Sequence, residues 1–236
     1  MSYSLFEEHL KKKTYKTLRQ DLQKLERDYD IRLEIHYGEI DPDLYHSLMK
    51  TLKRFIEDRF VGRTHKHSAL LKWDYYVDQS LGRIRSCSSI LFVLRHKSQP
   101  IAISLGHTIK NVLNSAITSY DKKFSRYSLG KIMFIKELEW CFLNGLRLLD
   151  TGWGNFEYKI KFSNAIYYYA THVMYPKKSF GKKVYAYFIG IFLEAKHYLI
   201  AIKNRRFKRS RDLYQGRWMQ VERFRTREYR QTDGTT

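Results

Sequence analysis

The sequence predicts an α/β protein with a central mixed β-sheet flanked by helices and with helical extensions at both ends of the chain. Two observations lead to this prediction. Some segments repeat apolar residues every three or four positions, as helices do, whereas others alternate apolar and polar residues, as half-buried strands do. The two kinds of segment also alternate along the chain, and a helical segment separates two of the middle strands, as a crossover between parallel neighbours would.

The first predicted element is an amphipathic helix with a basic exposed side. Its apolar residues at helical spacing are Leu18, Leu22, Leu25 and Tyr29. Basic residues fall on the other faces of the same helix, namely Lys16, Arg19, Lys24 and Arg27. The next residues, 31–37, alternate apolar and polar side chains and predict a half-buried strand.

Two helices and three strands are predicted next. Asp41 and Pro42 form an N-cap and first-turn pair for a helix that runs to about residue 60. A further helix covers residues 67–78. The strand-like runs are residues 88–95, 101–105 and 111–120. Because short connections separate these runs, we expect antiparallel neighbours.

The second half of the chain supplies the crossover and the last elements. Ser128 is an N-cap candidate for an apolar helix over residues 129–143, which Asn144 and Gly145 end. The remaining elements are, in order, a strand (147–150), a glycine-rich turn (151–154), a brief helix capped by Asn155, an aromatic-rich strand (165–174) and an amphipathic helix (181–203). We expect the strands ending at Tyr120 and Asp150 to be parallel neighbours that splay apart.

Domain organisation follows from this order. We expect a basic helical arm at residues 1–30, one main domain at 31–180, and a C-terminal amphipathic helix with a basic tail at 181–236. The formal net charge is +20, from 44 Lys and Arg against 24 Asp and Glu, which indicates an acidic partner. An acyl carrier protein, coenzyme A, tRNA and an anionic membrane surface all satisfy that requirement, and charge alone does not choose among them.

The cysteines and the chain's hydrophobicity indicate the compartment. Cys87 and Cys141 are not at metal-ligand spacing and are interpreted as free thiols of a reducing compartment. His65 and His67 lack a third ligand, so no metal site is predicted. The start has no apolar signal core, and the apolar run 184–193 is half of the roughly 20 residues that a membrane span needs. We expect a cytoplasmic protein, with peripheral attachment at the inner membrane face left open.

Four short motifs occur in a defined order between Tyr120 and Ser163. They are Tyr120-Asp121 at a strand end, Ser128-Leu129-Gly130 at a helix start, Asp150-Thr151-Gly152-Trp153-Gly154 after the next strand, and Tyr158-Lys159-Ile160-Lys161-Phe162-Ser163. This stretch resembles the acetyltransferase domain of the FemAB and cellulose-biosynthesis-protein-like branch of the GNAT superfamily. Two positions depart from the branch pattern, since Leu129 replaces the usual proline and Ser163 the usual glycine. Relatives also carry a second GNAT-like half, for which this chain has no room.

The resemblance implies a GNAT-like acyltransferase fold and an N-acyltransferase activity. The acyl group would move from an acyl-CoA, or from the acyl-phosphopantetheine of an acyl carrier protein, to an amine, with no tightly bound cofactor. A donor site is implied at the loop and helix start that hold Tyr120, Arg126, Ser128, Leu129, Gly130 and Lys131. Backbone N–H groups near Leu129, Gly130 and Lys131 would bind the donor's phosphates. An ordinary helix capped by Ser128 is the alternative.

Three residues in these motifs are candidates for catalysis, Tyr158 and Lys159 through the resemblance and Asp150 through its position at a strand end before a glycine-rich turn. Tyr158 would protonate the departing thiolate, or be a packed aromatic residue. Lys159 would stabilise developing negative charge, or be a surface lysine. Asp150 would act as a base, although a structural carboxylate that accepts from the N–H groups of Gly152 and Gly154 is the favoured interpretation. His107, in a strand, is a weaker candidate for the base.

Two other functions remain open from the sequence. One is an aminoacyl-tRNA-dependent transferase, as in the FemAB branch, and the other is a non-catalytic basic module that binds nucleic acid or membrane. The apolar stripe of the last helix comprises Val184, Phe188, Ile191, Phe192, Ala195 and Leu199. It is interpreted as core or homodimer packing, with binding to anionic lipid as the second choice.

Overall fold

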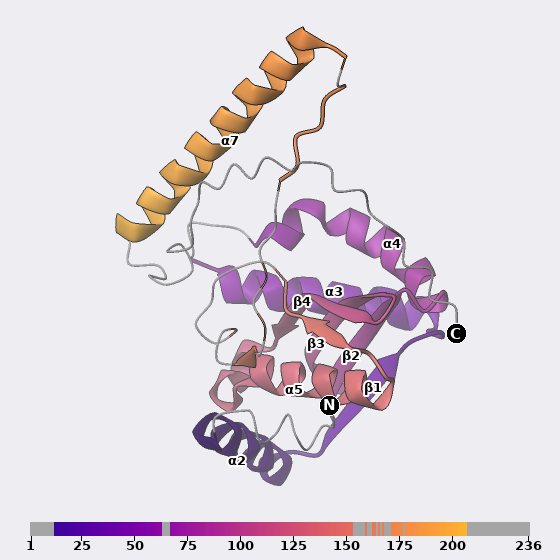
Figure 1. Cartoon of the computed structure of the whole chain (residues 1–236). Coiled ribbons are helices and arrows are strands. Elements are labelled where there is room, and N and C mark those ends of the chain that lie inside the picture. Colours follow the sequence, from indigo (N-terminus) through magenta and orange to yellow (C-terminus); the bar gives the residue numbers. More distant parts are fainter. Residues whose placement is uncertain are drawn as a thin grey trace, which may run out of the picture. The chain divides into compact units, whose positions relative to one another are not determined.

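The computed structural model describes residues 12–62, 67–152 and 178–206, together with residues 159, 162, 163, 165, 167 and 171–176. The chain forms two compact units, Met1–Gly154 and Asn155–Thr236. The first unit contains a five-stranded sheet and the helices that cover it (Figure 1). The domain boundaries expected at residues 30 and 180 stay a prediction.

The sheet has the strand order β1-β2-β3-β4-β5. Its strands are β1 (Ile31–His36), β2 (Ser89–His96), β3 (Gln99–Ile109), β4 (Val112–Tyr120) and β5 (Leu148–Asp150). The first four strands pair antiparallel in chain order, and β5 pairs parallel with β4. The predicted mixed sheet, with parallel strands before and after the crossover helix, is therefore confirmed.

Helices cover both faces of the sheet (Figure 1). The elements are α2 (Lys12–Asp28), α3 (Pro42–Phe60), η1 (Ser68–Lys72), α4 (Trp73–Arg85), η2 (Lys122–Tyr127) and α5 (Leu129–Leu143). The carboxylate of Asp41 caps α3 by accepting from the N–H of Leu44 at 2.9 Å, as predicted. The helix expected at 67–78 instead begins as the 3₁₀ turn η1 and continues as α4 to Arg85.

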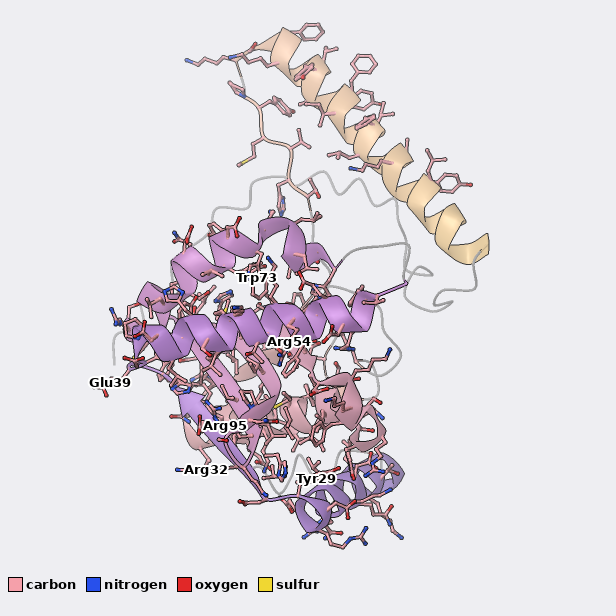
Figure 2. All side chains as sticks on the ribbon, turned by 180° about the vertical axis from the view of Figure 1, so that it is seen from behind. Tyr29, Arg32, Glu39, Arg54, Trp73 and Arg95 are labelled. Carbon is pink, nitrogen blue, oxygen red and sulfur yellow. The ribbon has the colours of Figure 1, made fainter. Side chains whose placement is uncertain are left out.

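Alternating side chains of the strands divide the core into two layers. Leu91 and Val93 of β2 pack with α3 and α4 on one face, whereas Ile90 and Phe92 pack with α2 and α5 on the other. Figure 2 shows the first of these faces, which α3 crosses, with Trp73 at the start of α4. Residues 89–94 of β2 are buried on both faces, so the run from Ile90 to Leu94 is apolar rather than alternating.

The second unit contains α7 (Phe180–Arg206), which extends beyond the helix predicted at 181–203. The aromatic-rich strand predicted at 165–174 does not appear in the described residues of that segment, 165, 167 and 171–174. Tyrosine favours strands only where a neighbouring strand supplies pairing, and no ladder reaches these residues. The brief helix expected after Asn155 begins outside the described residues.

Candidate active site

The candidate site lies along residues 115–120 of β4, beyond the end of β5. This stretch of strand edge is called the opening; its narrow end is the end next to Asp150, and its wide end is at Tyr120. β5 pairs with β4 only at Val112, Leu113 and Asn114. β4 continues to Tyr120, so its last residues have no partner in β5 within the part of the chain that the structure describes. A strand edge of this kind presents backbone N–H and C=O groups that an extended ligand can pair with.

A β-bulge bends β4 beside this opening. Gly106 of β3 lies opposite Ser115 and Leu105 lies opposite Ile117, which leaves Ala116 without a partner on β3. A bulge increases the local twist and leaves the backbone of the extra residue unpaired. The packing here is close, because a Cβ added at Gly106 would lie 2.8 Å from Cδ1 of Leu113. A side chain at position 106 would therefore require the Leu113 side chain to move.

Helix α5 begins at the wide end of the opening with an unusual N-cap. Ser128 occupies the N-cap position in the left-handed conformation, at φ 55°, and its hydroxyl makes no capping hydrogen bond. N-cap residues that bond the first turn have extended backbone, which explains why this hydroxyl does not. The N–H groups of Leu129 and Gly130 have no acceptor among the described residues. The first turn therefore keeps two backbone donors and the positive end of the helix dipole for an anion.

The other residues that the sequence predicts at the acyl-donor site have different roles in the structure. The N–H of Lys131 donates to the carbonyl of Ser128 at 2.8 Å, so it does not point outward as expected. The side chain of Leu129 is fully buried in the core, which leaves only its backbone for a ligand. The guanidinium of Arg126 lies 4.7 Å from the ring centre of Tyr127 and bonds the hydroxyl of that residue. This hydroxyl in turn donates to Asp28 at 2.8 Å, which fixes η2 to α2.

Tyr120 lies against the first turn of α5, where a basic residue joins it. A Cβ added at Gly130 would be 3.5 Å from Cε1 of Tyr120, which is ordinary contact distance. The guanidinium of Arg59, at the end of α3, lies 4.3 Å from the centre of the same ring. Stacking on the ring holds a half-buried positive charge close to the free N–H groups of α5. No sequence pattern indicates Arg59, because the contact joins residues from separate elements.

Asp150 closes the narrow end of the opening. Its Oδ2 accepts from Nδ2 of Asn114 at 2.9 Å, and its Oδ1 accepts from the N–H of Gly152 at 2.8 Å. The first bond ties β5 to β4, and the second stabilises the turn in which Gly152 has φ 71°. The bond from Gly152 is one of the two that the favoured interpretation of this residue expected, whereas the bond from Asn114 was not expected. Gly154, the other expected donor, lies outside the described residues.

A sequence comparison decides the family. Residues 12–160 match the family model of the acetyltransferase (GNAT) domain, a span that includes β4, α5 and β5. The chain belongs to this GNAT acetyltransferase family. The prediction of an acyltransferase enzyme of the GNAT superfamily is thereby confirmed, whereas the FemAB-like branch stays a prediction. A comparison with curated proteins finds no match to this chain.

Several solved structures are remotely similar to this GNAT chain. A conserved protein of unknown function from Bacteroides thetaiotaomicron has 11% identity and a TM-score of 0.41, over 54% of this chain and 42% of that one. The PaiA N-acetyltransferase of Thermoplasma acidophilum, in complex with coenzyme A, has 12% identity and a TM-score of 0.39, over 49% and 75%. The aminoglycoside acetyltransferase meta-AAC0020 from an uncultured soil metagenomic sample, in complex with sisomicin, has 10% identity and a TM-score of 0.41, over 60% and 96%. The family assignment rests on the domain match, since likenesses this remote add no weight.

The two remaining catalytic predictions fall in the second unit. Tyr158 lies outside the described residues. Lys159 is half-buried, and its carbonyl accepts from Oγ of Ser163 at 2.7 Å. The roles implied for Tyr158 and Lys159 by the GNAT resemblance stay predictions.

The histidines noted in the sequence have structural surroundings. Nδ1 of His107 lies 2.8 Å from Oγ of Ser89, and its ring stacks on Tyr76, while burial lowers the pKa of His107. His67 caps η1 by accepting from the N–H of Ala69. No group of three metal-ligating side chains occurs in the residues that the structure describes. Across the same residues, no helix combines the length and hydrophobicity of a membrane span.

Proposed function

We propose that this protein is an N-acyltransferase that moves an acyl group from the phosphopantetheine thioester of an acyl-CoA to an amine. The observation that carries this proposal is the opening between β4 and β5, which ends at the uncapped first turn of α5. The opening joins the two features that such a donor requires. One is an unpaired strand edge for the amides of the pantetheine arm, and the other is an anion site for the diphosphate.

The donor would lie along β4 with its diphosphate at α5. The free N–H groups of Leu129 and Gly130 would bind phosphate oxygens, and Arg59 would add a positive charge from α3. The pantetheine amides would pair with the backbone edge of β4 between Ser115 and Tyr120. This arrangement brings the thioester to the bulge at the narrow end of the opening.

Acyl transfer at this position needs stabilisation of a tetrahedral oxyanion. The amine nitrogen attacks the thioester carbon, a C–N bond forms, the C–S bond breaks, and the electron pair leaves with sulfur. The bulge leaves Ala116 unpaired on β3, so its N–H is our choice for the group that bonds the developing oxyanion. Tyr158 remains the residue proposed to protonate the thiolate, and Lys159 the residue proposed to stabilise negative charge.

The finer assignments are part of the same proposal. The order of the motifs from Tyr120 to Ser163 supports the FemAB-like branch. The net charge of +20 supports a donor or partner of acidic character, which includes acyl carrier protein and tRNA besides free CoA. We place the protein in the cytoplasm, on the two free cysteines of the described chain.

An activity assay with three donors tests this function. The full chain is incubated with a panel of amines and with acetyl-CoA, acetylated acyl carrier protein or aminoacyl-tRNA, and the release of thiol or free tRNA is followed with product mass. Amine-dependent release of CoA with an acetylated product supports the proposal. Release only from aminoacyl-tRNA would replace CoA as the donor class, and no release together with no binding of CoA would refute the function.

A further inference from the structure

A buried polar cluster lies between α5 and the sheet, beside the candidate site. It consists of Ser104 on β3, Ser115 and Thr118 on β4, and Glu137 on α5. The hydroxyl of Ser104 donates to Oε1 of Glu137, and it lies 2.8 Å from the hydroxyl of Thr118. The hydroxyls of Thr118 and Ser115 are 3.5 Å apart. The cluster therefore joins a buried carboxyl to the strand that forms the opening.

The burial of Glu137 at this position costs folding free energy. Its side chain is 2% exposed, and Oε2 has no hydrogen-bond partner in the described structure. No basic side chain pairs with it among the ion pairs of the described residues. Burial of an unpaired carboxylate costs several kcal/mol, so a glutamine or leucine would suit the helix better if packing were the only requirement.

The cluster reaches the narrow end of the opening through Ser115. Asn114, the preceding residue, is the last residue of β4 that pairs with β5, and Ala116, the following residue, is the bulge. The carbonyl oxygen of Ser115 is 3.7 Å from the position of a Cβ on Gly152, which places Ser115 directly beside the end of β5. Ser115 is half-buried, so part of this residue is accessible beside the opening.

The pKa of Glu137 suits proton exchange near neutral pH. Burial raises the pKa of Glu137 to about 7, against a smaller lowering by the hydroxyls of Ser104 and Ser115. Cys141, one turn further along α5, interacts with it, but burial and the Glu137 charge raise the pKa of this thiol to about 12. β3 and β4 face Glu137 with hydroxyls, which do not titrate in this range. Asp150 of β5 lies on the opposite face, because its neighbour Leu149 packs in the α5 layer.

We propose that Glu137 is the proton acceptor for the acceptor amine, reached through the hydroxyl of Ser115. This inference rests on the proposed function. The ammonium gives a proton to the oxygen of Ser115 while the hydroxyl protons of Ser115, Thr118 and Ser104 each move one step toward Glu137, so that its carboxylate gains one proton. The neutral amine then attacks the thioester. After the C–N bond forms and the C–S bond breaks, the second nitrogen proton ends on sulfur. Glu137 returns to its carboxylate by releasing its proton to solvent.

The test is the pH dependence of acyl transfer in Glu137→Gln, which keeps the acceptor for Ser104 but cannot take up a proton. We expect kcat to fall by roughly 10² to 10⁴, the acidic limb of kcat/KM near pH 7 to disappear, and CoA affinity to stay unchanged. Ser115→Ala should reproduce the loss, and it serves as the second variant if Glu137→Gln folds poorly. Thr118→Val removes the hydroxyl between Ser115 and Ser104 and should also remove the limb, whereas Thr118→Ser retains this hydroxyl and should keep the limb.

An acidic limb near pH 7 that persists in Glu137→Gln or in Ser115→Ala, at a rate within threefold of the unaltered protein, would overturn the inference. That result is distinct from failure of the proposed function, since the latter is judged on whether the unaltered chain transfers acyl groups and binds CoA at all.

Discussion

Replacement of Glu137 by glutamine should change how the protein's stability depends on pH. The pKa of Glu137 is raised by burial to about 7 in the folded chain, from an ordinary value of 4.5. Between these two values the folded state holds a proton that the unfolded state has released. The free energy of unfolding therefore falls as pH rises through this window, and the loss is complete above the folded pKa. Glutamine carries no such penalty.

The magnitude follows from the gap between the two pKa values. A gap from 4.5 to about 7 amounts to about 3 kcal/mol, at about 1.4 kcal/mol per pH unit. The advantage of Glu137→Gln over the unaltered protein should therefore grow by about 2 to 3 kcal/mol between pH 5 and pH 8. In a melting curve this corresponds to about 5 to 10 °C for a chain of this size.

Urea unfolding at pH 5 and pH 8 measures this change directly. Glu139→Gln is the matched control, since Glu139 lies on the same helix, is half-buried and pairs with Lys136 at 2.9 Å. The control should differ between the two pH values by less than about 1 kcal/mol. Equal stability differences for Glu137→Gln at both pH values would refute the reasoning, because Glu137 would then be ionised or protonated alike in the folded and unfolded states.

Three further changes probe the site and the tail. Gly106→Ala should lower the free energy of unfolding by about 1 to 3 kcal/mol in urea unfolding, because its Cβ would clash with Leu113; an unaltered midpoint would contradict this packing. Arg59→Ala should weaken CoA binding about tenfold by calorimetry, whereas the control Arg54→Ala, a change of an exposed residue on the same helix, should not. Equal CoA affinities of the two variants would remove Arg59 from the donor site. The segment from Lys203 onward holds 11 Lys and Arg against 4 Asp and Glu, so truncation after Ile202 should slow association with acyl carrier protein and reduce the salt dependence of that association, while transfer from free acetyl-CoA is retained. Unchanged association rates at two salt concentrations would contradict this role.

The sequence could predict the β4, α5 and β5 unit because each part has a local signal. Apolar runs mark the strands, and Asn144 and Gly145 end the helix. Local signals also explain the capping of α3 by Asp41 and the bonding of Asp150 to Gly152. These features depend on residues that are close in the chain.

Features that depend on distant contacts could not be predicted in this way. The N-cap rule favours a capping hydroxyl at Ser128, but the tight connection from η2 places this residue in the left-handed conformation instead. The stacking of Arg59 on Tyr120 and the bulge at Ala116 leave no pattern in the sequence. The burial of Glu137 does have a sequence signal, since this residue lies four positions after Met133 and four before Cys141, on a buried face of α5.

A calorimetric titration of coenzyme A tests the central claim most directly, that the diphosphate of the donor binds at the first turn of α5. Gly130→Glu adds bulk and negative charge there, Gly130→Gln adds similar bulk alone, and pantetheine is a ligand without the diphosphate. We predict that Gly130→Glu binds CoA at least about tenfold more weakly than Gly130→Gln, and that the two variants bind pantetheine alike. Equal CoA affinities in both variants and in the unaltered protein would contradict the claim and remove α5 from the donor site.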